Sequence, residues 1–329
     1  MEWAPILGLI GACAIAWAAT GALPTLLERL AVIDTPNERS SHARPTPRGG
    51  GIAVLAAVAI CWFVAAPPGL LPLLALGLAL GAVGWWDDVR GLPATFRLAA
   101  QAGAVGAGLA LADIGPVFQG FLPASLDRAL AALVWLWFVN LFNFMDGIDG
   151  IAGTEAATIA LGLAWATAAT VPGGGLAEAA IAGAALGFLA WNWPPAKIFL
   201  GDVGSQALGF LLGFLLLRAA GDGQWAIALI LPLYFLADAT LTLLRRLFAG
   251  EAVWRAHRSH AYQRAVRALG GAHRPVLLKV LALDAALLAL AILVVAFPGF
   301  AFGAVAIGAA ATAALLWRFE RLARGADGR

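Results

Sequence analysis

Charged residues are scarce in this sequence. Asp, Glu, Lys and Arg make up 12% of its 329 residues, whereas hydrophobic residues make up 62% and the mean hydropathy is +0.86. A soluble domain carries roughly 25% charged residues. The composition therefore excludes an ordinary soluble protein and indicates an integral membrane protein.

Other features are also missing. The two cysteines, Cys13 and Cys61, lie inside apolar segments, so a disulfide framework is not expected. No basic residue precedes the first apolar segment, where Glu2 is the only early charge, and this disfavours a cleaved signal peptide. Walker-A, HExxH, GxSxG and dinucleotide-binding glycine motifs do not occur. Because no repeat or low-complexity linker divides the chain, we expect one domain over residues 1–329.

Long apolar runs dominate the sequence. A helix needs about 20 apolar residues to span a bilayer, and the pattern predicts an all-α integral membrane protein with about eleven transmembrane helices. The predicted segments are 4–27, 51–66, 70–86, 97–113, 129–143, 150–171, 176–191, 204–219, 225–244, 276–297 and 299–317. Pro67-Pro68-Gly69 and Pro298-Gly299 predict tight turns between neighbouring helices.

Basic residues fall on one side of this topology. With the N-terminus outside, only Arg128 and Arg218 of the 21 Lys and Arg residues lie on the outer side. The positive-inside rule describes this asymmetry. The predicted inner segments are 28–50, 87–97, 144–149, 192–203, 245–275 and 318–329.

Acidic and amide side chains gather on the same inner side. The stretch from Asn140 to Asp149 places two carboxamides and two carboxylates where a Trp-rich segment leaves the bilayer. Asp87-Asp88 and Asp202 flank similar segments. Placing carboxylate and amide oxygens at this depth of the membrane costs free energy unless a metal, a phosphate or water binds them. We therefore expect one metal-assisted site at the cytoplasmic face; the alternative is that loops simply tolerate acids.

Each of these motifs carries its own chemistry. Two adjacent carboxylates repel each other, so Asp87-Asp88 suits a general base or a cation anchor, unless the pair is only a solvated helix end. Gly201 and Gly204 let backbone approach a ligand beside Asp202. Phe199 offers an aromatic face there, or else anchors the chain in the membrane.

Two basic segments suit phosphate. Arg39, His42, Arg44 and Arg48 precede the glycine triplet 49–51, which opens a helix; a positive-inside anchor is the alternative. In the segment 257–264, the i, i+3 spacing predicts that His257 and His260 share one helix side. Without a nearby cysteine or third histidine, phosphate contact is favoured over zinc, and a solvated basic helix is the alternative.

Four of these motifs, in their order along the chain and at the ends of the predicted helices, resemble those of the polyprenyl-phosphate N-acetylhexosamine-1-phosphate transferase family. The resemblance covers about residues 34–264 and rests on four patterns: Asp-Asp, Asn-x-x-Asn-x-x-Asp-Gly-x-Asp-Gly, Gly-Asp-x-Gly-Ser and His-Arg-Ser-His. The run Pro232-Leu-Tyr-Phe-Leu-Ala-Asp238 before Arg245-Arg246 also resembles a helix of the family. Eleven helices, one more than in the peptidoglycan branch, resemble the bacterial N-acetylglucosamine-type branch.

The resemblance implies a reaction in which a UDP-sugar gives its sugar-1-phosphate to undecaprenyl phosphate and UMP leaves. It also implies a requirement for Mg²⁺, with Mn²⁺ as a substitute, and a multi-pass protein of the bacterial inner membrane with a cytoplasmic site. Asn143 and Asp202 would hold the metal, and Asp87 or Asp88 would position or deprotonate the lipid phosphate. The expected catalytic residues are Asp87, Asp88, Asp146, Asp149 and His260, and the expected substrate-binding residues are Arg48, Arg97, Asn140, Phe199 (stacking on uracil), His257 and Arg258.

Alternatives remain open for the donor sugar and for the class of protein. The loop Arg44-Pro-Thr-Pro-Arg48-Gly-Gly-Gly and the short histidine run differ from the peptidoglycan branch, so an N-acetylhexosamine donor for O-antigen or a related glycan is favoured over the muramoyl pentapeptide. An ion-coupled transporter is the rival class, with Asp238 and Asp284 as its only deep acids. Membrane lipid is an expected partner, a homodimer is compatible with the sequence, and nucleic acid is not expected.

Overall fold

The computed structural model describes residues 3–36, 44–252 and 257–327. Almost all regular structure in these ranges is helical, and one two-stranded ribbon completes it. The longer helices are α1 (Ala4–Arg29), α2 (Gly51–Ala65), α3 (Leu71–Arg90), α4 (Ala94–Leu111), α5 (Ala124–Met145), α6 (Ile151–Thr170), α7 (Leu176–Asn192), α8 (Gly201–Gly221), α10 (Leu233–Phe248), α12 (His273–Ala296) and α13 (Ala301–Asp327). The shorter elements are β1 (Ile33–Asp34), β2 (Thr46–Pro47), α9 (Trp225–Ile230), α11 (Ala261–Ala268) and the single 3₁₀ turns Pro68–Leu70 and Pro298–Phe300. Arg39 and His42 lie outside the described residues.

Each predicted apolar segment coincides with helix, and one segment is interrupted. The segment 225–244 contains α9 and the first part of α10, separated at Leu231 and Pro232. Pro232 has no N–H to donate to the carbonyl four residues earlier, which ends α9. Within the described residues, six helices are long and apolar enough to cross a membrane, while α2 and α7 are shorter apolar helices. The all-α integral membrane class is confirmed, and the number of spans stays a prediction.

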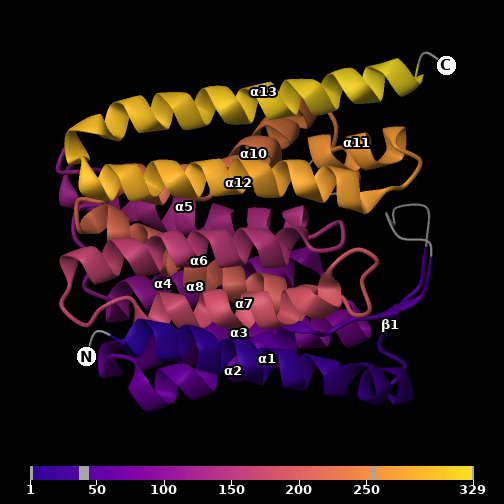
Figure 1. Ribbon diagram of the computed structural model, residues 1–329, viewed down its shortest axis with the longest axis horizontal. Coiled ribbons are helices and arrows are strands. Elements are labelled where there is room, and N and C mark those ends of the chain that lie inside the picture. Colours follow the sequence, from indigo (N-terminus) through magenta and orange to yellow (C-terminus); the bar gives the residue numbers. More distant parts are fainter. Residues whose placement is uncertain (1–2, 37–43, 253–256, 328–329) are drawn as a thin grey trace.

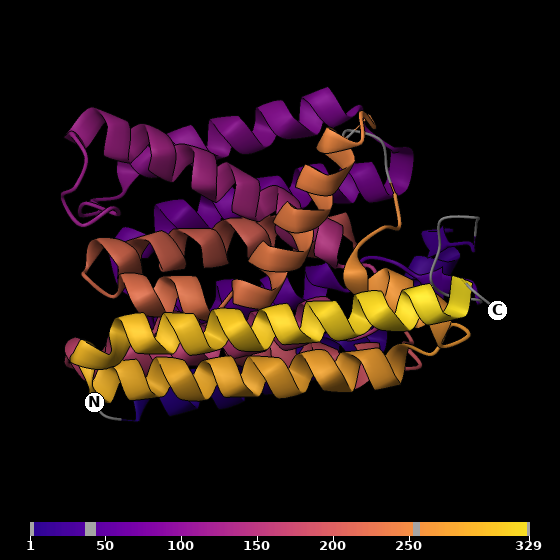
Figure 2. The same cartoon turned by 90° about the horizontal axis from the view of Figure 1, so that it is seen from above.

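Helix α8 is the centre of the bundle. Its apolar window is 94% buried inside the protein, and α2, α3, α5, α6 and α9 pack around it. Figure 1 shows α1 and α2 on one side of this core and the pair α12 and α13 on the other. Figure 2 shows from above that α12 and α13 lie side by side and that α10 crosses the bundle obliquely. A hydrophobic helix that is buried all round belongs in such a core position.

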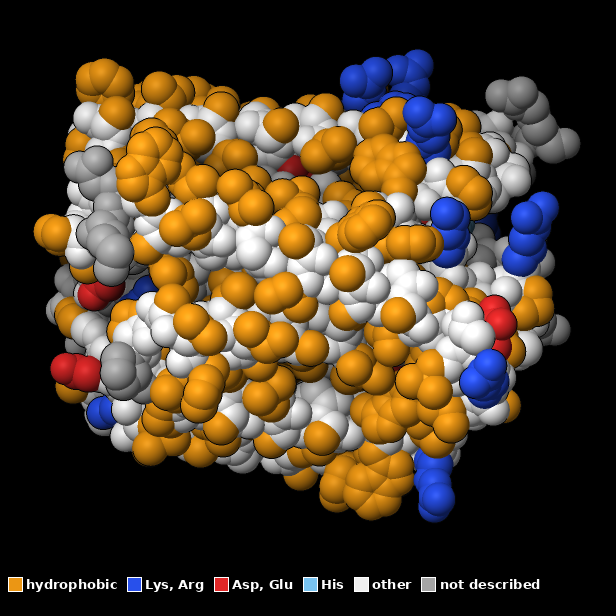
Figure 3. Space-filling model, turned by 60° about the horizontal axis from the view of Figure 1, so that its bottom comes forward, with side chains coloured by type: hydrophobic (Ala, Val, Ile, Leu, Met, Phe, Trp, Pro, Cys, Tyr) orange, Lys and Arg blue, Asp and Glu red, His pale blue; other side chains and the backbone are white. Residues whose placement is uncertain are grey.

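The connections that carry the predicted site residues lie together at one end of the bundle. The ribbon β1–β2, the α5–α6 loop and α11 are all at the right in Figure 1, while the N-terminus of α1 is at the left. Figure 3 shows most Lys and Arg side chains on its visible face at this same end, beside a broad hydrophobic surface. At the opposite end, Arg218 pairs with Glu178, and Arg128 Nη2 donates to the carbonyl of Leu109 at 2.7 Å. The predicted segregation of charge is therefore visible in three dimensions.

Candidate active site

The chain between β2 and α2 is hydrogen-bonded to Phe199 and Leu200, the residues that lead into α8. Strand β1 pairs antiparallel with β2, and the chain beyond β2 continues alongside Phe199. Phe199 N donates to Pro47 O at 2.9 Å, Gly50 N to Phe199 O at 2.8 Å, and Gly51 N to Leu200 O at 2.8 Å. These bonds fix Arg48 beside the start of α8.

Glycines let three helices meet at this point. A Cβ built on Gly51 would lie 2.3 Å from the Cα of Gly204, and one built on Gly84 would lie 2.2 Å from the carbonyl oxygen of Asp202. Any larger side chain at these positions collides with backbone. The close approach of α2 and α3 to the N-terminus of α8 therefore depends on residues without a Cβ.

Asp88 holds the N-terminus of α8. Its Oδ1 accepts a hydrogen bond from Asp202 N and its Oδ2 one from Val203 N, both at 3.0 Å. Arg48 Nε lies 3.1 Å from Oδ1, and the Asp88 side chain is fully buried. The first-turn N–H groups of a helix have no partner within it, so Asp88 caps α8 from another helix. This carboxylate has three partners and no exposed surface, which separates it from Asp87.

Asp87 lies at a junction with Arg97 and Asp202. Arg97 Nη1 is 2.5 Å from Asp87 Oδ2 and 3.2 Å from Asp202 Oδ2. Asn143 Nδ2 donates to Asp202 Oδ1 at 3.1 Å and to Ser205 Oγ at 2.8 Å. Side chains from α3, α4, α5 and α8 thus converge on Asp202, whose own side chain is 18% exposed and can be reached from solvent.

Asp146 follows α5 directly and adds a further acid. Burial raises the pKa of Asp146 to about 7, the negative charge of Asp202 adds to this effect, and the positive charge of Arg48 opposes it. The neighbouring carboxylates of Asp88 and Asp149 contribute in the same direction as Asp202. The centre of the site therefore gathers more negative charge than its two arginines balance, a condition that a cation relieves.

The donor set fits a magnesium ion that is shared with phosphates. In the described residues, no group of three or more His, Cys, Asp or Glu side chains is arranged to hold a metal. Mg²⁺ does not need such a group, since it is usually bound by one or two carboxylates together with water and substrate phosphates. Asp202 supplies a partly exposed carboxylate, and Asn143 keeps its carbonyl oxygen when its amide nitrogen donates to Asp202.

Asp149 has both carboxylate oxygens engaged within the protein. Oδ1 lies 3.1 Å from His273 Nδ1, at the start of α12, and Oδ2 accepts from Ala196 N at 2.9 Å. Asn192 reinforces this corner by accepting from Gly150 N at 2.8 Å. Neither His273 nor Asn192 was among the predicted site residues. The available signal was a polar side chain at the inner end of an apolar segment.

His260 is placed by Asp238, which was also not among the predicted site residues. Asp238 Oδ1 accepts from Ala261 N at 2.8 Å and lies 3.7 Å from His260 Nδ1. Its Oδ2 accepts from Tyr262 N at 3.3 Å and from Tyr234 Oη at 3.1 Å. The carboxylate on α10 therefore caps α11 and orients the residue that precedes it. An isolated acid in an apolar segment was the signal for this role.

The helix expected over the histidine pair is wrong. His260 is extended (φ −58°, ψ 148°) and α11 begins after it, because Asp238 caps that helix at Ala261. The two rings nevertheless lie 4.9 Å apart. Burial lowers the pKa of His257 to about 4, with the positive charges of His260 and Arg246 acting in the same direction, so this ring is neutral at pH 7.

Tyr262 connects the segment from His257 to His260 with the acidic cluster formed by Asp87, Asp88, Asp146 and Asp202. Tyr262 Oη donates to the carbonyl of Phe144 at 3.3 Å, and a Cβ built on Gly147 would lie 2.3 Å from the same Oη. Helix α11 thus packs against the loop that carries Asp146. The histidine segment and the acids therefore belong to one site.

Two predicted site residues stand apart. Asn140 Nδ2 donates to Leu136 O at 2.8 Å on its own helix. Arg258 is exposed, and its carbonyl accepts from Arg267. In the part of the chain that the structure describes, neither side chain bonds to the acidic cluster. The backbone of Phe199 lies in the ribbon beside Arg48, with its side chain half-buried.

The fold and the site define a polytopic membrane protein with an acidic, arginine-lined centre at one end of its helices. A family model described as glycosyl transferase family 4 matches residues 70–220, which include Asp87 to Asp202. The decaprenyl-phosphate N-acetylglucosaminephosphotransferase of Mycobacterium tuberculosis is 30% identical over 317 residues, covering 83% of this chain and 78% of that protein. The chain therefore belongs to glycosyl transferase family 4, within the polyprenyl-phosphate N-acetylhexosamine-1-phosphate transferases that its motifs resemble.

Two further relatives show the breadth of the family. A protein of Bacillus subtilis named probable undecaprenyl-phosphate N-acetylglucosaminyl 1-phosphate transferase is 27% identical, covering 77% of this chain and 74% of its own length. The phospho-N-acetylmuramoyl-pentapeptide-transferase of Mycolicibacterium gilvum is 29% identical, covering 74% and 82%. Family membership alone therefore leaves the donor sugar open.

Proposed function

We propose that the protein transfers N-acetylhexosamine-1-phosphate from a UDP-sugar to undecaprenyl phosphate and thereby starts a lipid-linked glycan, such as an O-antigen or a related envelope polysaccharide. An oxygen of the lipid phosphate bonds to the β-phosphorus of the donor, the bond to the α-phosphate breaks, and UMP leaves. The main support is the junction of Asp87, Arg97, Asn143 and Asp202, where one partly exposed carboxylate meets side chains of three other helices. We place this junction at the cytoplasmic face of a bacterial inner membrane, where a lipid phosphate and a soluble nucleotide can meet.

The residues serve positioning and charge neutralisation, which are the main demands of phosphoryl transfer. A bound Mg²⁺, held by Asn143 and Asp202, would neutralise diphosphate charge. Asp87 would position the lipid phosphate or accept its proton, with Arg97 fixing the carboxylate. Asp88 would act indirectly by holding the start of α8.

Other side chains would hold the donor. Arg48 is partly exposed beside Asp88 and would face phosphate, while Phe199 would stack on uracil. Asp146 and the segment from His257 to His260 would contact the sugar or nucleotide, since Tyr262 connects that segment with the loop of Asp146.

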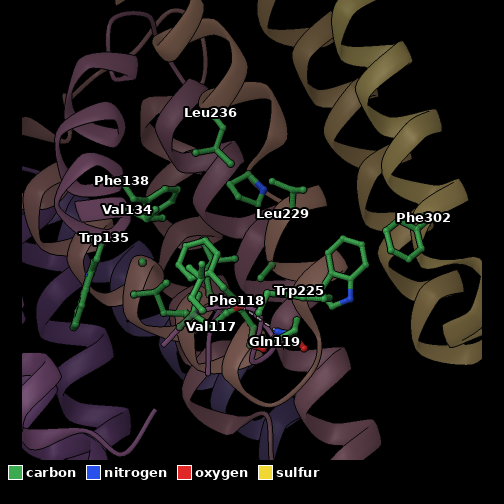
Figure 4. Close-up of a pocket in the computed structure, with 18 residues that line it drawn as sticks. Val117, Phe118, Gln119, Val134, Trp135, Phe138, Trp225, Leu229, Leu236 and Phe302 are labelled. Carbon is green, nitrogen blue, oxygen red and sulfur yellow. Dashed lines mark hydrogen bonds between the residues drawn. The ribbon is translucent and has the colours of Figure 1, made fainter. Parts of the chain in front are cut away.

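The acceptor's hydrocarbon tail also has a suitable surface. A cavity of about 790 Å³ lies between α5, α8, α9 and the α4–α5 loop. Figure 4 shows Val134, Trp135, Phe138, Trp225 and Leu236 among its lining residues. On α5, Phe138 and Val134 precede Asn143 by about 8 and 14 Å of helix rise. We propose that a long polyprenyl chain, with its phosphate at the acidic junction, places a distal part of its hydrocarbon in this cavity.

The muramoyl pentapeptide stays the alternative donor, because relatives with either donor in their names match this chain. The Arg-rich loop and the short histidine run favour the smaller N-acetylhexosamine. A transporter is disfavoured because the predicted site acids gather at one end of the bundle. Midplane sites at broken helices are usual in that class.

Release of UMP tests the function. Purified protein is incubated with undecaprenyl phosphate and either UDP-N-acetylglucosamine, its 6-deoxy relatives or UDP-muramoyl-pentapeptide, with Mg²⁺ or with EDTA. We expect UMP and a lipid diphosphate sugar from an N-acetylhexosamine donor only when Mg²⁺ is present. Turnover of the muramoyl pentapeptide alone would replace the donor, and no UMP from any UDP-sugar would refute the transferase proposal.

A further inference from the structure

Two acids are buried inside the bundle, away from the candidate active site. Glu155 lies in the second turn of α6, and Asp284 lies near the middle of the 24-residue helix α12. Both residues have 0% exposed surface. The two helices pack against each other and run side by side in Figure 1. Intramembrane acids are costly, and when they occur they usually have a function.

The two carboxyl groups lie within hydrogen-bonding reach of each other. Among the described residues, no conventional donor bonds to any of their four oxygens. An ionised carboxylate only accepts hydrogen bonds, so two carboxylates cannot bond to each other. A carboxyl–carboxylate contact forms only if one of the two groups carries a proton, which then lies between them.

The surroundings stabilise one negative charge, but not two. The backbone N–H of Phe235, in the first turn of α10, faces Glu155 without completing a hydrogen bond. Because α10 begins at the break after Pro232, its first N–H groups have no partner within the helix and its N-terminus carries a partial positive charge. No cationic side chain of the described residues acts on either acid.

The other titratable groups near the pair come from α10. The negative charge of Asp284 acts on Tyr234, whose hydroxyl donates a hydrogen bond to Asp238. Asp238 is saturated by the N–H groups that start α11 and by Thr242. Neither residue supplies a positive charge, so nothing described in the vicinity balances a second ionised carboxylate.

We propose that Glu155 and Asp284 form an intramembrane proton-binding site, in which one bound proton joins the two carboxyl groups and ties α12 to α6. The O–H of one group donates to an oxygen of the other, and the remaining negative charge faces the start of α10. The contact between Asp149, two residues before α6, and His273, the first residue of α12, lies at the start of the same two helices. The bound proton thereby secures the inner support of the candidate active site.

Infrared spectroscopy of the purified protein tests for the proton. We expect a carbonyl band of a protonated carboxyl at pH 7 that shifts in D₂O. Asp146, whose pKa is raised to about 7, contributes to the same band. The band should therefore lose intensity, and not vanish, in Glu155→Gln and in Asp284→Asn, because an amide N–H replaces the carboxyl O–H and the charge of the pair stays the same. Equal intensity in the wild type and in both variants would overturn the proposal. The matched control is Asp222→Asn, an exposed acid at the opposite end of the bundle, which should keep the band.

Stability gives a second readout. Glu155→Gln and Asp284→Asn should melt close to wild type at pH 7. The wild type should lose thermal stability at alkaline pH, as the proton dissociates, more than either variant does. A wild-type spectrum without a protonated-carboxyl band at pH 7 would overturn the proposal, whether or not the variants fold. A rise in the melting temperature of the wild type with NaCl, but not with choline chloride, would also overturn it in favour of a sodium site.

Discussion

The guanidinium of Arg48 lies 3.1 Å from the carboxylate of Asp88, and this pair joins the first loop to the helix that presents Asp202. The same carboxylate caps α8 at Asp202 and Val203. Its sequence neighbour Asp87 instead contacts Arg97, which also reaches Asp202. Adjacent acids on one helix therefore serve different purposes, because successive side chains point about 100° apart around the axis.

Asp87→Asn and Asp88→Asn should separate these purposes. Loss of the Asp87 charge should lower kcat by about 10²–10⁴-fold if it acts as a general base, with little change in UDP-sugar affinity. Asp88→Asn should instead lower the free energy of unfolding by about 1–3 kcal/mol, because an amide nitrogen replaces one of the two carboxylate oxygens and leaves one N–H of α8 without an acceptor. Steady-state kinetics and thermal melts of both variants check this. A stable Asp88→Asn variant paired with an unstable Asp87→Asn variant would reverse the assignment.

Gly84→Ala should damage activity through sterics alone. The new methyl group would lie 2.2 Å from the carbonyl of Asp202, so α3 must move away from α8, and overpacking of this kind costs about 1–3 kcal/mol. We expect lower kcat and a lower melting temperature. Gly103→Ala is the matched control, because nothing lies within 4 Å of its Cβ in helix α4. Equal behaviour of the two variants would show that the close contact is unimportant.

Asn143→Ala and Asp202→Ala should remove metal-dependent turnover. If these residues hold Mg²⁺, each alanine variant should lose more activity than the roughly 10–100-fold that is lost when a residue supporting a metal ligand is removed. Ser205→Ala is such an outer change, since Ser205 accepts from the amide of Asn143. Activity against Mg²⁺ and Mn²⁺ concentration measures the effect. Near-normal activity and metal response in either alanine variant would rule out that residue as a ligand.

The sequence predicted the helices well because each apolar run in a membrane protein must satisfy its own backbone, which leaves helix as the main solution. It also predicted that Asp87, Asn143 and Asp202 share one end, since charge asymmetry orders the loops. The different contacts of Asp87 and Asp88 were not predictable. They depend on how closely α3 packs on α8, and that packing depends on Gly84 meeting the backbone of Asp202, more than 100 residues later in the chain.

Long-range partners were beyond the sequence for a similar reason. His273 meets Asp149 across 124 residues, and no local pattern encodes such a pair. The helix expected at His257 and His260 failed because Asp238, on a different helix, caps α11 one residue later. Glu155 lies in an otherwise apolar run, and its proposed role depends on its contact with Asp284 in α12. Tertiary contacts therefore decided these features.

His257 should make the protein sensitive to acid. Its pKa is lowered to about 4 in the folded protein, below the value of about 6.5 expected in the unfolded chain. Between these values the unfolded state binds more protons, so stability falls as the pH falls from about 6.5 toward 4. His257→Gln should lose less stability over this range than wild type. Thermal melts at pH 8 are the control, since both proteins should then show no contribution from this ring.

The proposed orientation can be tested by labelling single cysteines in intact cells. Asp222 lies just beyond α8 at one end of the bundle, and Gly270 lies between α11 and α12 at the end of the acidic cluster; both are exposed. All but two of the 21 basic residues follow the predicted inner side. With Cys13 and Cys61 replaced by alanine, a membrane-impermeant maleimide should label Asp222→Cys but not Gly270→Cys until the membrane is permeabilised. Labelling of Gly270→Cys alone in intact cells would invert the topology and move the acidic cluster away from cytosolic nucleotide sugars.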